Sequence, residues 1–207
     1  MWTEAGSLVE IWLMRHGAYE GHRAGHHAPR DVPLSEAGRT QAAVATPLPT
    51  GVSAIVSSPL PRAAQTAEIV SRLTGLPVIA SSDLLSEWRA PSAVIGRTTD
   101  DYPPAYIDWR RQRAQNPAVA FEDGESLAQL HDRACRAAEH VSALARSYGS
   151  GLLVVSHKLL LGVLCALDDG PVAFEHAARA DWGFAEIRPF RETDAPHSSS
   201  FRSARQS

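Results

Sequence analysis

The feature that most constrains the fold is a continuous apolar run, Leu152-Leu153-Val154-Val155-Ser156, which ends at His157. A run with no polar alternation predicts a strand buried on both faces. Such strands belong to parallel sheets that are covered by helices. The glycines at 149 and 151 break the chain before this strand, and the apolar segment 159–167 predicts a helix after it. The sequence around this strand therefore indicates an α/β fold.

The rest of the chain alternates strand and helix patterns in the same way. Short apolar runs predict strands at residues 9–14, 52–57, 77–80 and 181–187. Helices are expected at 36–45, 59–73, 102–115 and 127–146. Ser35 is the expected N-cap of the first helix, Ser58-Pro59 opens the second, and Ser126 with Gln129 forms a capping box for the last. This alternation favours an α/β fold, a three-layer α/β/α sandwich with a mostly parallel central sheet.

Length and charge narrow the class of protein further. The chain has 207 residues, and we expect one domain over 1–190 followed by a disordered tail over 191–207. Neither a signal-peptide pattern nor a membrane-spanning apolar run is present, so we expect a cytoplasmic protein with no membrane partner. The net charge of -3 supplies no overall positive field for nucleic acid. Any site for an anion must therefore be local.

Three predicted strands end in residues that suit an anion site. These residues are Arg15-His16-Gly17, Ser57 leading to Arg62, and Ser156-His157. In open parallel sheets, ligands bind outside the carboxyl ends of the strands. Two histidines and two arginines there can surround one tetrahedral anion, and phosphoryl transfer depends mainly on positioning and charge stabilisation. The set is therefore sufficient for phosphate chemistry with no metal and no other cofactor. Taken singly, each element also has an ordinary interpretation, such as a surface arginine or a histidine at a helix start.

Taken together, these segments resemble the histidine phosphatase superfamily, which has the phosphoglycerate mutase-like fold. The resemblance rests, in the order of the family, on residues 13–17, 33–42, 57–67, 124–126 and 154–157. It covers about residues 9–187. It implies a metal-independent phosphomonoesterase of the histidine acid phosphatase type, which hydrolyses a small phosphorylated metabolite. A homodimer is compatible with the sequence.

The resemblance also implies a role for each core residue. His16 would attack the phosphorus and form phosphohistidine, which water then hydrolyses. Arg15, Arg62 and His157 would hold the phosphoryl oxygens. Glu87 aligns best with the proton donor of the family.

Several positions near the expected nucleophile are less certain in role or depart from the family pattern. Glu20, in the loop after His16, is the second candidate for the proton donor. Gly17 is expected to let the backbone turn and a ligand approach. His22 occupies a site that is often asparagine in the mutases of the family, and Lys158 replaces the usual glycine after the second histidine. We expect Gly17, His22 and Lys158 to contact the substrate.

Three alternatives remain open. A phosphoglycerate-type mutase would keep phosphohistidine from water, and a pseudoenzyme would bind phosphorylated ligands without turnover. A zinc site at His22, His26 and His27 is disfavoured, because the glycines and proline between them oppose a helix.

The irregular segments 18–30 and 88–123 should determine the specificity. Their large side chains either line a pocket or pack as a cap over the sheet: Trp88, Arg89, Tyr102, Tyr106, Trp109 and Arg110.

Overall fold

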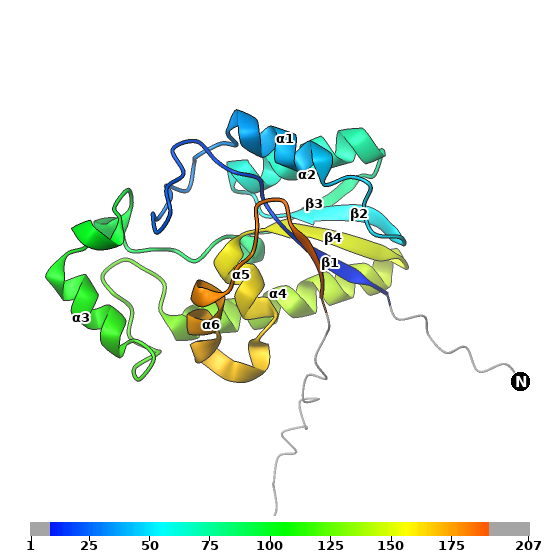
Figure 1. Cartoon of the computed structure of the whole chain (residues 1–207). Helices are drawn as coiled ribbons and strands as arrows, with labels where there is room; N and C mark the ends of the chain where they lie inside the picture. Colours follow the sequence, from blue (N-terminus) through cyan, green and yellow to red (C-terminus); the bar gives the residue numbers. More distant parts are fainter. Residues whose placement is uncertain (1–8, 191–207) are drawn as a thin grey trace, which may run out of the picture.

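The computed structural model describes residues 9–190, which are built around one five-stranded sheet (Figure 1). Its strands are β1 (Ile11–Arg15), β2 (Val52–Ser57), β3 (Val78–Ser81), β4 (Gly151–Ser156) and β5 (Ile187–Phe190). The strand order is β3-β2-β4-β1-β5. The first four strands are parallel, and β5 pairs antiparallel with β1 at the sheet edge. The predicted mostly parallel sheet is thus confirmed.

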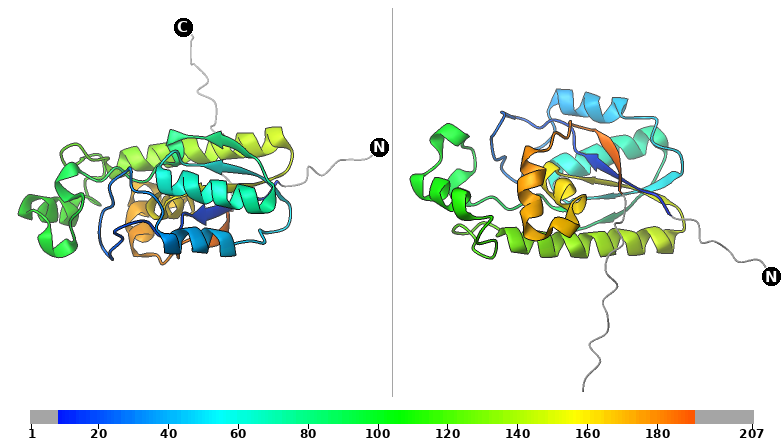
Figure 2. Two further views of the ribbon diagram at one scale, coloured as in Figure 1. Left: turned by 90° about the horizontal axis from the view of Figure 1, so that it is seen from above. Right: turned by 60° about the horizontal axis from the view of Figure 1, so that its bottom comes forward.

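Helices cover both faces of the sheet and give the predicted three layers (Figure 2). They are α1 (Glu36–Val44), α2 (Pro61–Thr74), α3 (Pro104–Gln112), α4 (Leu127–Tyr148), α5 (Lys158–Leu164) and α6 (Ala173–Arg179). Helices α1 and α2 lie on one side of the sheet, and α4, α5 and α6 lie on the other. Short 3-10 turns cover Asp83–Leu85, Ser92–Val94, Thr99–Asp101 and Leu167–Val172. Among the residues described, no helix is long and apolar enough to span a bilayer.

The continuous apolar run of strand β4 packs into two hydrophobic cores, one on each face of the sheet. Side chains of a strand alternate between the faces of the sheet. Leu152 and Val154 therefore pack in the core beneath α4, α5 and α6, whereas Leu153 and Val155 pack in the core beneath α2. Each of these four side chains is fully buried. Both faces of β4 are thus apolar because helices cover both of them.

The helix boundaries mostly follow the capping signals. The Ser35 side chain accepts a hydrogen bond from the Gly38 N–H at 3.1 Å, and Ser126 with Gln129 forms the predicted capping box. The predicted opening of the second helix at Ser58-Pro59 is wrong, because α2 begins two residues later at Pro61. The hydroxyl of Ser58 instead contacts His157, at 2.8 Å from the imidazole Nε2.

Two further elements differ from the sequence expectation. The helix predicted over 102–115 begins only at Pro104, because Tyr102 and Pro103 are held extended, as residues before proline usually are. The strand predicted over 181–187 is wrong: residues 183–186 form a turn in which Ala185 has a φ of 57° and the Glu186 N–H donates to the Gly183 carbonyl, and β5 starts at Ile187. Helix α6 was not predicted. The tail prediction over 191–207 falls outside the described residues, and the single domain over 1–190 stays a prediction.

The parallel register brings the three anticipated strand ends to one edge of the sheet. Arg15 pairs with Ser156 across β1 and β4, and Ser57 pairs with Val155 across β2 and β4. The His16 N–H continues this ladder by donating to the Ser156 carbonyl at 2.9 Å. The residues that follow β1, β2 and β4 therefore emerge side by side.

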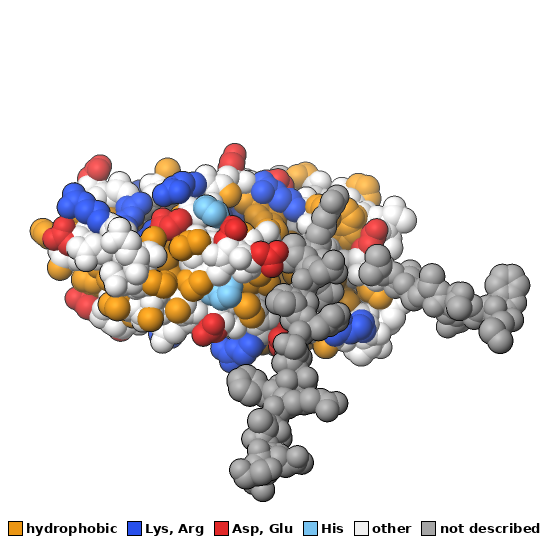
Figure 3. Space-filling view, turned by 90° about the horizontal axis from the view of Figure 1, so that it is seen from below, with side chains coloured by type: hydrophobic (Ala, Val, Ile, Leu, Met, Phe, Trp, Pro, Cys, Tyr) orange, Lys and Arg blue, Asp and Glu red, His pale blue; other side chains and the backbone are white. Residues whose placement is uncertain are grey.

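A second structural unit stands beyond this edge. The segment from the 3-10 turn at Ser92–Val94 through α3 projects past the end of the sheet, and the loop between β1 and α1 runs toward it (Figures 1 and 2). The two segments are joined where the Gly96 N–H donates to the His27 carbonyl at 3.0 Å. Away from this edge, the face viewed in Figure 3 carries charges of both signs interspersed with hydrophobic side chains.

We predict that Gly38→Ala destabilises the fold. A Cβ at Gly38 would overlap the backbone of Ala18, which the loop cannot withdraw without moving Gly17. The expected loss is about 2–4 kcal/mol of unfolding free energy, measured by urea denaturation. Arg39→Ala, an exposed change on the same helix, is the control and should stay within about 0.5 kcal/mol of the parent. Equal stability of the two variants would contradict the close packing of α1 on the loop.

Candidate active site

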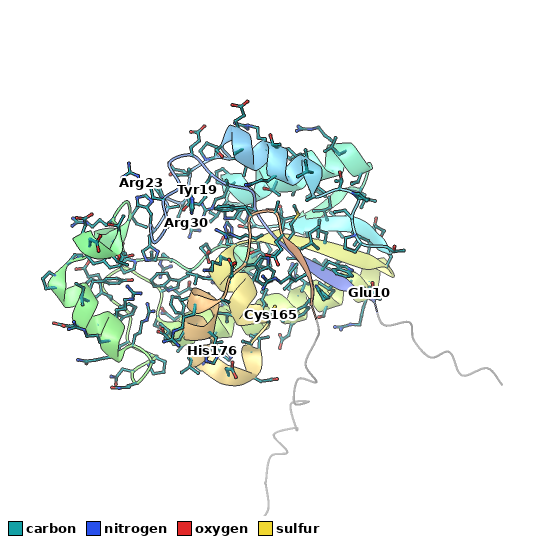
Figure 4. All side chains as sticks on the ribbon, in the orientation of Figure 1. Glu10, Tyr19, Arg23, Arg30, Cys165 and His176 are labelled. Atoms are coloured by element: carbon teal, nitrogen blue, oxygen red, sulfur yellow. The ribbon has the colours of Figure 1, made fainter. Side chains whose placement is uncertain are left out.

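A pocket of about 790 Å³ opens where the strand ends meet the projecting segment. At the sheet edge it is lined by Arg15, His16, Arg62, Glu87 and Lys158. Its remaining walls come from the loop after β1, from the segment around α3, from α6 and from the turn that precedes β5. Figure 4 shows Tyr19, Arg23 and Arg30 along the loop after β1. The predicted site residues that line the pocket are Arg15, His16, His22, Arg62, Glu87 and Lys158, whereas Gly17 and the fully buried His157 do not line it.

His16 lies at the base of this pocket with one ring nitrogen available for chemistry. Its Nδ1 is 2.7 Å from the Gly17 carbonyl oxygen, so this nitrogen carries the proton and donates it. Its Nε2 then bears a lone pair, which accepts a hydrogen bond from Arg62 Nε at 3.2 Å. Burial, together with the charge of Arg62, holds the pKa of His16 well below its usual value. The imidazole is therefore neutral at neutral pH, as a nucleophile must be.

Arg15 and Arg62 supply positive charge on either side of His16. Arg15 is the last residue of β1, and Arg62 lies in the first turn of α2. Burial lowers the pKa of both guanidinium groups. Among residues 9–190, neither arginine forms an ion pair. An anion bound between them would therefore replace solvation that both groups have lost.

Other contacts fix these two guanidinium groups in place. Arg15 Nη1 donates to the carbonyl oxygen of Trp182, and its guanidinium carbon lies 3.9 Å from the centre of the Phe184 ring. Arg62 Nη1 donates to the carbonyl oxygens of Pro29 and Arg30 at 3.2 and 3.3 Å. The loop after β1 is thereby attached to Arg62 at the sheet edge of the pocket.

His157 lies beside His16 and completes the cluster of His16, Arg15 and Arg62. Its ring centre is 5.0 Å from that of His16, and its Nε2 contacts the Ser58 hydroxyl. Its Nδ1 is buried and has no hydrogen-bond partner among the described residues. Burial and the neighbouring His16 lower the pKa of His157 well below its usual value. An unpartnered nitrogen this close to His16 is suited to a phosphoryl oxygen.

Glu87 lines the pocket, whereas Glu20 is exposed and lies outside its lining. The carboxylate of Glu87 accepts backbone hydrogen bonds from Trp88 at 2.9 Å and from Leu159 and Leu160 at 3.2 Å each. These donors, two of them in the first turn of α5, fix the carboxylate beside the cluster. The geometry favours Glu87 over Glu20 as the carboxyl group within reach of a bound phosphate ester.

The segment that carries Glu87 is held by an ion pair that the sequence did not reveal. Arg133 of α4 contacts both carboxylate oxygens of Glu125, at 2.8 and 2.7 Å. It also donates to the carbonyl oxygens of Leu84, Ser86 and Glu87, at 3.0, 2.7 and 3.4 Å. Arg133 and Glu125 are 14% and 9% exposed. No local sequence pattern marks the contacts of Arg133 with these carbonyl oxygens, because they lie 46–49 residues away from it along the chain.

The three expected substrate contacts have different positions. His22 is exposed and lines the pocket, with its ring 4.9 Å from that of Phe184. Lys158 is half-buried in the lining and donates to the Ala178 carbonyl at 3.3 Å; burial, followed by Arg15, lowers the pKa of its amine. Gly17 does not line the pocket. A glycine is required there because a Cβ would overlap the backbone of Gly38, and its contact with the substrate stays a prediction.

The sequence left open whether the large side chains of the projecting segment line a pocket or pack against one another, and in the structure they do both. Tyr102 and Tyr106 form a small core with Val94, and both also line the pocket. Trp88, Arg89 and Arg110 line it as well, but Trp109 does not. Within residues 9–190, no three His, Cys, Asp or Glu side chains are grouped as metal ligands.

This arrangement defines a class of site. A neutral, buried histidine lies between two arginines, and a second histidine and a carboxylate lie nearby. It can bind a phosphate group and offer a nucleophile to it. The comparison with known families agrees with this class. The chain matches the histidine phosphatase superfamily (branch 1) over residues 11–181 and belongs to that superfamily. The resemblance noted in the sequence is thereby confirmed.

Several relatives and solved structures are similar to the chain. The probable phosphoglycerate mutase GpmB of Serratia proteamaculans is 31% identical over 161 residues, covering 76% of this chain and 73% of that protein. A structure named mycobacterial hydrolase 1 has a TM-score of 0.72 and 28% identity, covering 92% of each chain. Mycobacterial glucosyl-3-phosphoglycerate phosphatase in complex with VO3 has a TM-score of 0.66 and 28% identity, covering 87% of this chain and 90% of that one.

We predict that the His16 imidazole stays neutral at about pH 6, below the usual histidine pKa of about 6.5. A lowered pKa means that protonation requires a lower pH. Nitrogen-15 NMR of the ring should report Nδ1 protonated and Nε2 unprotonated at that pH. The exposed ring of His176 on α6 is an internal reference for the ring signals. Protonation of His16 at or above pH 6.5 would contradict the electrostatics of the site.

We also predict that Arg133→Met destabilises the protein by about 3–5 kcal/mol, because it leaves the Glu125 carboxylate buried without its partner. Chemical denaturation measures this loss. Arg111→Met is the matched control: its ion pair with Asp108 is exposed, so the change should cost less than about 1 kcal/mol. Similar losses in the two variants would show that the Arg133 pair does not hold the Glu87 segment.

Proposed function

We propose that the protein is a metal-independent phosphomonoesterase of the histidine acid phosphatase type, which hydrolyses a small phosphorylated metabolite through a phosphohistidine on His16. The observation that carries the proposal is the state of His16: its Nε2 is unprotonated, buried and adjacent to Arg62. Arg15, Arg62 and His157 would hold the phosphoryl oxygens. Four nitrogen-bearing side chains around one anion are chemically sufficient for this transfer.

The reaction has two steps in this proposal. In the first, His16 Nε2 forms a bond to phosphorus while the bond from phosphorus to the ester oxygen breaks. The departing oxygen receives a proton from the carboxyl group of Glu87. In the second, the Glu87 carboxylate takes a proton from water, and the water oxygen attacks phosphorus. The bond between phosphorus and His16 breaks, which releases inorganic phosphate and restores both side chains.

A mutase is the second candidate, because curated relatives 31–32% identical to this chain are named probable phosphoglycerate mutases. A mutase must keep the phosphohistidine from water and return the phosphoryl group to the bound intermediate. The pocket of about 790 Å³ has room for water beside a small substrate, which favours hydrolysis. A pseudoenzyme would need a defect at the nucleophile or the arginines, and each of these residues is present. A cytoplasmic location and a homodimer stay predictions.

We predict that the protein releases phosphate from p-nitrophenyl phosphate and that His16→Ala lowers kcat at least about 1,000-fold. Arg39→Ala, on the surface of α1, is the control and should retain full activity. Incubation with a monophosphoglycerate and its bisphosphate primer separates the candidates. Isomerisation without phosphate release would establish a mutase, and no reaction with any phosphate ester would establish a pseudoenzyme.

Glu87→Gln provides a separate test of the proton donor. Aryl phosphates with poor leaving groups need protonation most, so their hydrolysis should slow far more than that of activated esters. The measurement is kcat/KM across aryl phosphates of increasing phenol pKa. Glu20→Gln is the matched control and should leave this dependence unchanged. A uniform loss across the series in Glu87→Gln would exclude its role as the acid.

A further inference from the structure

The part of the pocket far from His16 is lined by rings and by one free guanidinium group. We call it the distal compartment, and it consists of His27, Trp88, Tyr102, Tyr106 and Arg110. Three of the four tyrosines in the chain line the pocket, and two of these belong to the compartment. Phosphate itself needs none of these residues. The compartment is therefore available to the organic part of a phosphate ester.

The rings of the compartment form a continuous series. The His27 ring centre is 5.4 Å from that of Trp88 and 6.0 Å from that of Tyr102, which it nearly parallels at 22°. Tyr102 in turn lies 5.0 Å from Tyr106. Because Trp88 directly follows Glu87 in sequence, this series extends outward from the candidate reaction centre.

The rings are electrically neutral in spite of the arginines near them. Burial, followed by the charges of Arg110 and Arg113, lowers the pKa of His27 to about 4. Burial raises the pKa of Tyr102, and that of Tyr106 to about 12. Arg113 is committed to Glu175 through an ion pair of 2.7 Å. Arg110 has no ion pair among the described residues, so its guanidinium plane remains free.

Hydrogen bonds fix the compartment relative to the phosphate end of the pocket. The Tyr102 hydroxyl donates to the Gly25 carbonyl at 3.2 Å, and the Gly96 N–H donates to the His27 carbonyl. Gly25 and His27 belong to the loop after β1, and the other end of this loop is attached to Arg62 through the carbonyls of Pro29 and Arg30. A ligand that occupies both ends would therefore meet walls that are already in place, which reduces the entropic cost of binding.

We propose that the distal compartment binds a planar aromatic or heteroaromatic ring in the alcohol part of the substrate, several bonds away from the phosphate. This inference rests on the proposed function for the placement of the phosphate at His16. The neutral His27 ring and the free guanidinium plane of Arg110 are surfaces on which flat π systems stack favourably, and the buried rings of Trp88, Tyr102 and Tyr106 support them from behind. His27 and Arg110 are then the specificity-determining residues, since they are the more exposed polar members of the compartment.

The test compares matched ligands that differ only in the ring. Adenosine 5′-monophosphate is paired with ribose 5-phosphate, and 2-phenylethyl phosphate is paired with ethyl phosphate. Calorimetry on the full-length His16→Ala protein measures binding without turnover. We expect the ring-bearing member of at least one pair to bind about tenfold more tightly or better. Equal affinities within both pairs would overturn the inference, as would tighter binding of glucose 6-phosphate than of either ring-bearing ligand.

Variants made in the same His16→Ala protein assign the effect to the compartment. His27→Ala and Arg110→Ala should each reduce the affinity ratio at least about threefold. Arg111→Ala is the control, because Arg111 lies on the same helix, pairs with Asp108 and does not line the pocket. A ratio that neither distal variant changes would overturn the inference. If the unmodified protein showed no phosphatase activity while the ring preference remained, only the proposed function would be disproved.

Discussion

The interaction on which the site depends is the crowding of positive charge around a neutral, buried histidine. Arg15 and Arg62 are held beside His16 by backbone carbonyls and by Phe184. No carboxylate forms an ion pair with either guanidinium within residues 9–190. This arrangement disfavours protonation of His16 and favours a bound dianion. One electrostatic imbalance therefore keeps His16 neutral and favours an anion beside it, which are the two conditions that the proposed mechanism needs.

The fold maintains this imbalance through long-range contacts. The parallel register of β1, β2 and β4 fixes the spacing of the residues that follow each strand. The Arg133 and Glu125 pair, on the far side of the sheet from α2, fixes the segment that ends in Glu87. The loop after β1 connects Arg62 to the segment around α3. These contacts thus connect His16, the two arginines and the distal compartment.

Much of the fold and of the site was predictable from the sequence because its signals are local. The continuous apolar run of β4, the cap at Ser35 and the capping box at Ser126 each depend on a few adjacent residues. Contacts between distant segments were not predictable. The Ser58 hydroxyl contacts His157 and does not cap α2, and no sequence pattern marks the contact of Arg133 with the Leu84 carbonyl. The prediction of a strand over 181–187 failed because residues 183–186 form a turn, in which the Glu186 side chain accepts a hydrogen bond from the Gly183 N–H. The close packing of Gly17 on Gly38 requires a glycine, and its contact with the substrate stays a prediction.

The central claim is that His16 carries the phosphoryl group during turnover. Rapid acid-free quenching of the protein with ³²P-labelled substrate, followed by peptide mapping, tests this most directly. The account predicts one labelled peptide that contains His16, with a bond that is stable in alkali and labile in acid, as a phosphoramidate should be. It also predicts that the label disappears when unlabelled substrate is added. Label on another residue, or turnover with no labelled protein at any time, would contradict the account.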